Sequence, residues 1–357
     1  MRNSVITGTG KYIPNRIIEN DYFINNVFYT DDNQLYDKSA QEVIEKFVEI
    51  TEIKQRRYVE DNQFNSDIAT LAAEKAIESA GIDRNDLDYV IVAHNYGDIE
   101  SKQFRTDIMP SISARVKHKL KIKNNRCRPY DVNFGCPGWV EGLIMAHQFI
   151  QANLANKILV IGSETLSRAV DVYDRNSMIF ADGAGAVVLE AKEISEKRGV
   201  LSYLTISDNG DEISYLGNGP SLNKESHSNC ITVSMKGRKI YEYALRKVPA
   251  VVKTAIEAAK LDIKDIKKIF LHQANAKMDH AMVERLFKLY GLTEIPEHIA
   301  PMTVDFLGNS SVATIPTMYD MVLRGEMENH SLQSGDIVAF GSVGAGMNIN
   351  ALIYQLP

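Results

Sequence analysis

The stretch 131–139, which reads Asp-Val-Asn-Phe-Gly-Cys-Pro-Gly-Trp, places one cysteine where a thiol could act as a nucleophile. It lies between a short β-like run and a pattern of apolar residues with helical period over 139–154. Glycines on either side of Cys136 permit a tight turn, and Pro137 fits the first helical position because a proline there loses no hydrogen bond. A thiol at a helix N-terminus is expected to favour the thiolate. The local pattern therefore leaves two interpretations of Cys136, a nucleophile or a small buried apolar residue.

Two further polar side chains stand at the ends of predicted elements. His272 follows the apolar run 267–271, and Asn309 precedes the helical pattern 313–323. An imidazole N–H and an amide N–H are donors that can stabilise a developing oxyanion. Taken alone, such a histidine is also compatible with a hydrogen-bonded core residue, and such an asparagine with a helix cap.

An internal repeat relates these residues to one another. Segment 76–94 resembles 255–273, and 159–163 resembles 338–342 at the same offset of 179 residues. Between the matched segments, Cys136 corresponds roughly to Asn309. The chain therefore reads as two copies of one α/β unit, with Cys136 and Asn309 at equivalent helix starts. Because chemistry gathers at strand ends in open α/β sheets, the repeat predicts that these residues converge with His272.

The elements that position these residues are predicted from periodicity and from Gly and Pro signals. Helices are expected over 39–50, 65–81, 107–120 (interrupted at Pro110), 139–154, 236–259, 279–290 and 313–323, and strands over 4–10, 88–94, 128–133, 156–163, 267–271, 336–346 and 349–354. In the glycine-rich stretch 180–189 a strand follows the glycines, so we expect close backbone packing there and no phosphate loop. The basic cluster 54–57 is expected to be a solvated face rather than a ligand contact.

Composition limits the class of protein. The 357 residues are 45% hydrophobic and 24% charged, with a net charge of −6, which argues against general nucleic-acid or membrane-surface binding. Three cysteines make neither a disulfide framework nor a spaced metal site, so no metal or bound cofactor is expected. The start of the chain does not resemble a signal peptide, and no apolar run is long enough for a transmembrane helix. A cytoplasmic enzyme fits these properties.

The motifs together resemble the thiolase superfamily, and most closely its β-ketoacyl-acyl carrier protein synthase III branch, over nearly the whole chain. The motifs that carry the resemblance are 131–138, 174–175 with 182–186, 272–275, 308–311 and the closing glycine segment 341–350. The resemblance implies an α/β thiolase-like fold, in which two duplicated βαβ-rich halves form a layered α-β-α-β-α core. In this chain the halves would be 1–195, with the nucleophile, and 196–357, with the histidine and asparagine.

The resemblance also implies roles for single residues. Cys136 would accept an acyl group as a thioester. His272 and Asn309 would stabilise the enolate formed when a malonyl thioester loses carbon dioxide. The backbone N–H groups of Cys136 and Gly344 would form a second oxyanion hole. The implied activity is decarboxylative condensation in fatty acid or related lipid biosynthesis, by a homodimer that uses malonyl-loaded acyl carrier protein.

This sequence departs from the family at the site for coenzyme A. Many members hold the adenine with a Trp and an Arg, where this chain has Lys46 and Ile50, although Arg175 matches another coenzyme A contact. A primer carried by acyl carrier protein is therefore favoured, with acyl-coenzyme A as the alternative. Met109 matches the residue that a partner subunit places at the acyl pocket. Lys277, with a basic group at 236–239, would dock the acidic carrier, unless these are only solvated lysines.

The same residues bear on other activities of related enzymes. A type III polyketide or alkylresorcinol-type synthase also uses Cys, His and Asn and is the alternative enzyme. A degradative thiolase would need a second catalytic cysteine near the C-terminal glycines, but the only later cysteine is Cys230. A hydroxymethylglutaryl-type synthase would need a glutamate base, and neither Glu141 nor Glu164 lies in a matching motif. A non-catalytic subunit that binds acyl carrier protein usually lacks the nucleophile, which is present here as Cys136.

Overall fold

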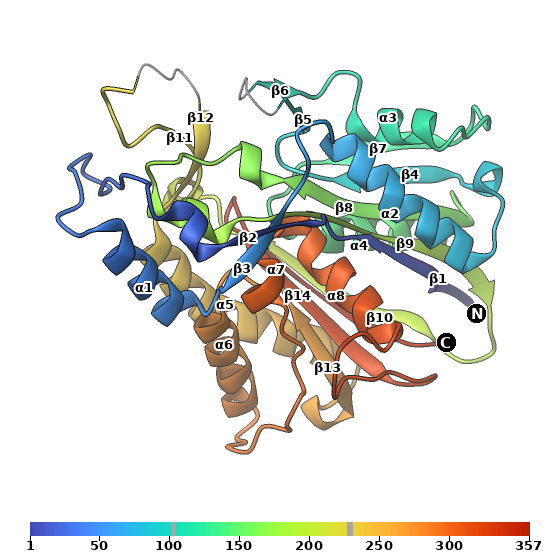
Figure 1. Ribbon diagram of the computed structural model, residues 1–357. Helices are drawn as coiled ribbons and strands as arrows, with labels where there is room; N and C mark the ends of the chain where they lie inside the picture. The colour runs from blue at the N-terminus through green and yellow to red at the C-terminus, as the bar shows by residue number, and fades with distance from the viewer. Residues whose placement is uncertain (101–104, 227–230) are drawn as a thin grey trace.

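Two β-sheets form the frame of the molecule in a computed structural model, which describes residues 1–100, 105–226 and 231–357 (Figure 1). The first sheet has the strand order β1-β9-β8-β4-β7 and the second β10-β15-β14-β13. Their strands are β1 Arg2–Tyr12, β4 Tyr89–Ala93, β7 Arg128–Val132, β8 Lys157–Thr165, β9 Asp182–Glu193, β10 Gly199–Ser207, β13 Ile266–Leu271, β14 Ile337–Gly344 and β15 Asn348–Gln355.

The two sheets share one topology. In the first, β4 runs parallel to β8, and β9 pairs antiparallel with both β8 and β1. In the second, β13 runs parallel to β14, and β15 pairs antiparallel with both β14 and β10. The order β1-β9-β8-β4 thus corresponds strand for strand to β10-β15-β14-β13, with β7 as an addition. The duplication predicted from the sequence repeat is confirmed by this shared arrangement.

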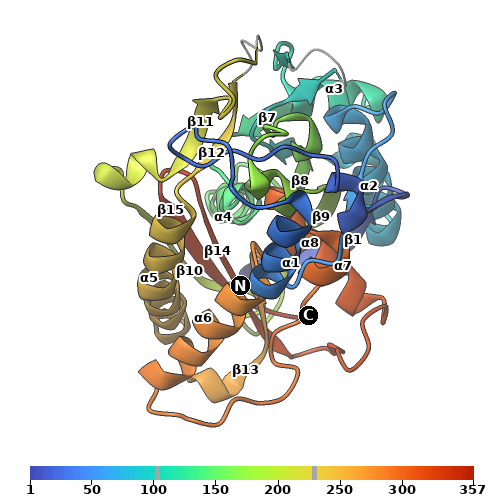
Figure 2. The same ribbon diagram turned by 60° about the vertical axis from the view of Figure 1, so that its left-hand side comes forward.

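Helices cover both sheets and fill the space between them (Figures 1 and 2). The principal helices are α1 Ala40–Thr51, α2 Asn65–Ala80, α3 Ile112–Lys119, α4 Gly138–Gln151, α5 Gly237–Ala258, α6 Ala276–Leu289, α7 Val304–Leu307 and α8 Thr314–Leu323. Buried residues of α4 and α8 form one apolar cluster with the inner faces of both sheets. Helices α2 and α3 cover the outer face of the first sheet, and α5 and α6 cover that of the second. The layered α-β-α-β-α thiolase-like fold is therefore confirmed.

Short elements complete the chain. They are β2 Arg16–Glu19, β3 Gln55–Tyr58, β5 Asp98–Ile99, β6 Thr106–Asp107, β11 Leu216–Pro220, β12 Ile231–Met235 and the 3-10 turn η7 Ser311–Ala313. Of the residues described, none belongs to a helix that is both long and apolar enough to cross a membrane.

Glycines let the start of α8 lie directly against the first sheet. A Cβ on Gly162 of β8 would lie 2.2 Å from the Val312 carbonyl oxygen, and one on Gly185 of β9 would lie 2.7 Å from Pro316 Cβ. Both distances are shorter than real Cβ contacts, so only glycine permits this approach. The predicted packing role of the glycine-rich strand β9 is confirmed, and the segment that follows Asn309 is held close to the first sheet.

The solvated face predicted for the basic cluster 54–57 is wrong for Arg56, whose side chain is fully buried. Its guanidinium donates hydrogen bonds to the carbonyl oxygens of Met178 and Ile18 and to Asn20 Oδ1. Burial lowers the pKa of Arg56 to about 10. The sequence could not show this, because the acceptors come from distant or separate segments. Arg56 is therefore a buried cross-link that joins the segment 18–20 to Met178.

Besides Arg56, the structure buries a second titratable side chain that was not identified from the sequence, Asp279 on helix α6. Asp279 is 1% exposed, and neither carboxyl oxygen has a hydrogen-bond partner in the described part of the chain. Burial raises the pKa of this carboxyl well above its usual value. Because the folded pKa exceeds the unfolded pKa, stability is greatest below the unfolded pKa and falls as pH rises toward the folded pKa.

Replacing Asp279 by leucine is therefore expected to raise the free energy of unfolding, and to do so more at pH 8 than at pH 5. The expected gain at acid pH is about 1–3 kcal/mol, from removal of an unsatisfied buried polar group. Above the unfolded pKa, the difference should grow by up to about 1.4 kcal/mol per pH unit. Urea unfolding at the two pH values measures it. Asp279→Asn, which stays polar but does not titrate, should show the pH-dependent part alone. Equal gains at both pH values for both variants would contradict the assignment.

Candidate active site

Cys136 lies in a tight turn between β7 and α4. Gly135 has a φ of 66°, in the left-handed region that favours glycine, and a Cβ there would lie 2.7 Å from the Ala345 backbone nitrogen. Helix α4 begins at Gly138, so Pro137 stands at the N-cap, one position before the predicted one. The half-buried Cys136 side chain lines a cavity of about 660 Å³. A small molecule bound in this cavity can therefore contact the thiol.

The surroundings of Cys136 favour the protonated thiol at neutral pH. Burial raises the pKa of Cys136 to about 11, and the negative charge of Glu164 adds to that shift. The Ser311 hydroxyl, with Oγ 3.3 Å from Sγ, and the backbone N–H of Cys136 oppose it. The expectation of a thiolate from the helix N-terminus alone is thus wrong, because desolvation outweighs it. Acyl transfer here requires the thiol to lose its proton as it attacks.

Asn309 is held so that its amide nitrogen is the free end. Its backbone N–H donates to the Ile179 carbonyl at 3.0 Å, and its carbonyl accepts from Ala181 N at 2.8 Å. Its side-chain Oδ1 accepts from Ser311 N at 2.8 Å. The preceding Gly308 has a φ of 72° and lies so close to Arg56 that a Cβ would be 2.6 Å from Arg56 Cβ. The structure therefore fixes the amide orientation and leaves the N–H₂ group as a donor.

His272 follows β13 at the equivalent end of the second sheet. It is 3% exposed, and its backbone N–H donates to the Gly341 carbonyl at 2.9 Å. Burial lowers the pKa of the ring to about 4, and a contact with the Ser311 backbone opposes that shift. Among the residues described, none pairs with His272 Nδ1. At pH 7 the imidazole is therefore neutral and carries one N–H donor.

Ser311 lies at the meeting point of the three predicted residues. Its hydroxyl contacts Cys136 Sγ, its backbone N–H contacts Asn309 Oδ1, and its backbone also lies against the His272 ring. Cys136, His272 and Asn309 are thus brought together around one residue, as the repeat predicted. Ser311 also lines the Cys136 cavity, whereas His272 and Asn309 contact Ser311 from behind that lining. A thiol, a neutral imidazole and an amide are the groups needed for attack on a thioester and stabilisation of an oxyanion.

Gly344, predicted for a second oxyanion hole, ends β14 against the nucleophile turn. A Cβ on Gly344 would lie 2.6 Å from Cys136 N and 3.1 Å from Cys136 Cβ. The two backbones are therefore in contact, which leaves no room for a side chain at position 344.

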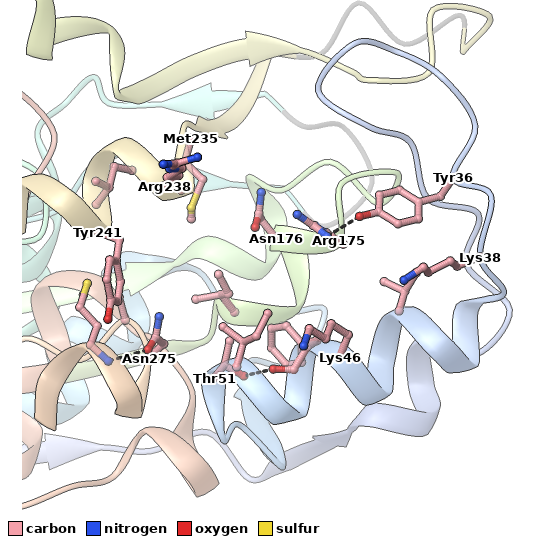
Figure 3. Close-up of a pocket in the computed structure, with 18 of the residues that line it drawn as sticks. Tyr36, Lys38, Lys46, Thr51, Arg175, Asn176, Met235, Arg238, Tyr241 and Asn275 are labelled. Atoms are coloured by element: carbon pink, nitrogen blue, oxygen red, sulfur yellow. Dashed lines mark hydrogen bonds between the residues drawn. The ribbon is translucent and has the colours of Figure 1, made fainter. Parts of the chain in front are cut away.

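A second cavity, of about 330 Å³, opens beside α1 and the first turns of α5 and α6 (Figure 3). Lys46 and Ile50, the positions of the missing adenine clamp, both line it, as does Arg175. Arg175 stacks on the Tyr36 ring, 5.3 Å from its centroid, and donates a hydrogen bond to the Tyr36 hydroxyl. The cavity thus contains a cation–aromatic pair, Arg175 with Tyr36. At the position where the resemblance implies an aromatic ring it has Lys46, which forms an ion pair with Glu49.

The other two predicted residues lie on the surface. Met109 is 86% exposed and is absent from the lining of the Cys136 cavity of its own chain, which its neighbour Ile108 does line. Lys277 is exposed on the first turn of α6, one residue before Met278, which lines the second cavity. Neither residue touches the three converging side chains.

Sequence analysis assigned no role to Asn95, Glu164 or Ser311, although all three surround the thiol. Asn95 Nδ2 donates to Glu164 Oε2 at 2.7 Å and to Ser311 Oγ at 3.1 Å. Asn95 lies just after the end of β4, and Glu164 is the second-last residue of β8, which runs parallel to β4. The signal available in the sequence was their place at strand ends, where polar residues of α/β proteins gather.

Comparisons with known proteins agree with this geometry. The profile of the family described as "3-Oxoacyl-[acyl-carrier-protein (ACP)] synthase III" matches residues 130–209, and that of its C-terminal part matches 256–356. The chain is 32% identical to a "Beta-ketoacyl-[acyl-carrier-protein] synthase III" of Ehrlichia canis, over 100% of each chain. It is 32% identical to the protein of that name from Xanthomonas campestris pv. campestris, over 96% of this chain and 95% of the other. The crystal structure of 3-oxoacyl-[acyl-carrier-protein] synthase III from Aquifex aeolicus VF5 superposes with a TM-score of 0.80 and 26% identity, covering 99% of this chain and 100% of that one.

Proposed function

The chain belongs to the 3-oxoacyl-[acyl-carrier-protein] synthase III family, and from this membership we propose a two-step condensation at Cys136. In the first step, the Cys136 sulfur bonds to the acyl carbonyl of a primer thioester, and the primer's carrier leaves as a thiol. In the second, a malonyl thioester loses carbon dioxide and its enolate carbon attacks the acyl carbonyl. The bond to Cys136 then breaks and a 3-oxoacyl carrier thioester leaves.

The observation that carries this proposal is the convergence of Cys136, His272 and Asn309 around Ser311. His272 and Asn309 present neutral N–H donors, which can hold the enolate oxygen without neutralising it by proton transfer. The backbone N–H groups of Cys136 and Gly344, whose backbones touch, would receive the oxyanion of the tetrahedral intermediate at the acyl carbonyl. Each oxyanion of the reaction thus has its own pair of donors.

The malonyl group arrives on acyl carrier protein, the carrier that the family name specifies. Lys277, Arg238 and their exposed basic neighbours would meet this acidic partner at the mouth of the second cavity. The primer also arrives on carrier protein rather than coenzyme A, because Lys46 and Ile50 provide no ring to stack on adenine. The Tyr36–Arg175 pair is a cation–aromatic contact of which both members line this cavity.

The working form is a cytoplasmic homodimer in which Met109 reaches the acyl cavity of the partner subunit. Support comes from the 86% exposure of Met109 and from the adjacent Ile108, which is exposed and also lines the Cys136 cavity. Within each subunit the duplicated halves would divide at 195/196, in the connection between β9 and β10.

The competing activities find less support. Family membership separates the chain from type III polyketide synthases, and the half-buried Cys136 thiol speaks against a non-catalytic carrier-binding subunit. Cys230, the only cysteine available for a degradative thiolase, lies outside the described residues.

Intact mass spectrometry tests the first step. Incubation with a panel of acyl carrier protein thioesters should add the mass of one acyl group to the protein. The matched coenzyme A thioesters should react more slowly, by about tenfold or more, which corresponds to the loss of one stacking contact. Rates across primers of different length then define the acyl specificity. The proposal fails if neither carrier yields an adduct under conditions where a known synthase III is acylated.

A further inference from the structure

Ser311 is a buried hydroxyl in an uncommon backbone conformation beside the nucleophile. It is 2% exposed and has a φ of 53°, in the left-handed region that non-glycine residues rarely adopt. Such a conformation persists only where surrounding contacts fix it, and such contacts gather at functional sites. Ser311 therefore needs an explanation beyond its place at the start of α8.

The hydrogen bonds around Ser311 fix the direction in which its hydroxyl proton points. Asn95 Nδ2 donates to Ser311 Oγ at 3.1 Å and so occupies one acceptor site of the hydroxyl. The single hydroxyl proton is then directed to another acceptor, and Cys136 Sγ lies 3.3 Å from Oγ. In this arrangement the Cys136 sulfur accepts a hydrogen bond from the Ser311 hydroxyl.

The orientation of the Asn95 amide is itself determined. Glu164 Oε2 accepts from the Asn95 backbone N–H at 2.8 Å and from Asn95 Nδ2 at 2.7 Å. A carboxylate attracts the N–H₂ end of an amide and repels the oxygen end, so the nitrogen faces Glu164 and Ser311. Glu164 is fully buried at the end of β8. A rigid sheet strand is thus linked, through three side chains, to the sulfur.

We propose that Ser311 is a positioning residue that donates a hydrogen bond to the Cys136 sulfur, oriented by Asn95 and anchored by Glu164. The inference deepens the proposed function and rests on it for its catalytic meaning, since a hydrogen-bond donor stabilises the thiolate that attacks the primer. The reactivity of the thiol itself can be measured without any acyl substrate.

The network makes two opposing contributions to the thiol. The Ser311 hydroxyl lowers the pKa of Cys136, whereas the charge of Glu164 raises it, both within a larger rise due to burial. Three further titratable groups line the cavity with the thiol, namely His94, Asp131 and Tyr96. His94 pairs with Asp131 and acts on Glu164, and His272 lies against the Ser311 backbone. Removing the hydroxyl and removing the carboxylate charge should therefore change thiol reactivity in opposite directions.

The test is the rate at which iodoacetamide alkylates Cys136 in the full chain, followed by peptide mass spectrometry over a range of pH values. Below the thiol pKa this rate is proportional to the thiolate fraction. Ser311→Gly, which accepts the left-handed backbone, should slow alkylation about tenfold at a fixed pH, equivalent to one pKa unit. Ser311→Ala should slow it equally, and Asn95→Ala should slow it less. Burial raises the pKa of Glu164 to about 7, so Glu164→Gln should accelerate alkylation above that pH, where the wild-type carboxylate is charged.

Ser310→Ala is the matched control, because the Ser310 hydroxyl contacts Thr314 and has no bond to Cys136. It should react at the wild-type rate. Wild-type or faster alkylation of Ser311→Gly would overturn the proposal, as would slowing in Ser311→Ala alone, which would implicate the backbone. If Ser311→Gly does not fold, an unchanged rate in Asn95→Ala overturns it. A chain that shows the expected alkylation pattern but forms no acyl adduct would refute the proposed function and leave this inference standing.

Discussion

Replacement of Cys136 by alanine is expected to abolish formation of the acyl adduct and to lower condensation by about 10⁴-fold or more, because no other group can carry the acyl chain. Decarboxylation of a malonyl thioester should persist in this variant. The neutral His272 ring and the Asn309 amide remain in place to hold the enolate oxygen, and neither depends on the sulfur for its orientation. Intact mass spectrometry measures the adduct, and release of carbon dioxide measures decarboxylation.

Cys127→Ala is the matched control for this variant. Cys127 is buried in the apolar cluster on the outer face of the first sheet, away from the cavity, and its pKa is raised to about 11 by burial. Loss of this thiol should leave the adduct unchanged. Adduct formation by the Cys136→Ala protein would show that another residue is the acyl acceptor.

Replacement of His272 by alanine is expected to have the converse effect. Acylation of Cys136 should continue within a few fold of the wild-type rate, while malonyl decarboxylation should fall by about 10²–10³-fold, the usual loss for one oxyanion donor. Burial holds the ring neutral with a pKa of about 4, so its role is to donate an N–H bond and not a positive charge. Decarboxylation by the wild-type enzyme should accordingly show no loss attributable to this ring between about pH 8 and pH 5.

Asn309→Asp sharpens the same prediction. The carboxylate keeps an oxygen to accept from Ser311 N, as Oδ1 does at 2.8 Å, but replaces the amide donor with a negative charge. Decarboxylation should fall at least as far as in His272→Ala. His280→Ala, an exposed histidine of α6, is the control and should retain both steps. Equal loss of acylation and decarboxylation in His272→Ala would contradict the separate roles proposed for Cys136 and His272.

The sequence alone determined the fold class and the identity of the converging residues. The repeat, at an offset of 179 residues, predicted two related α/β units, and the shared strand order of the two sheets bears this out. Periodicity placed α1 and α2 to within one or two residues, and Gly81 marked the end of α2. These features are local, or arise from duplication of local patterns, so they can be read directly along the chain.

Only the tertiary structure decided the hydrogen-bond partners of these residues and the direction in which their pKa values shift. The bond from Ser311 to Cys136 spans 175 positions, and the bond from Asn95 to Ser311 spans 216, so no local pattern could reveal either. Burial, not the helix N-terminus, sets the thiol pKa, just as burial turned Arg56 into an internal cross-link and left Asp279 without a partner. Desolvation depends on every atom packed around a group, and that environment exists only after the two sheets have closed on the helices between them.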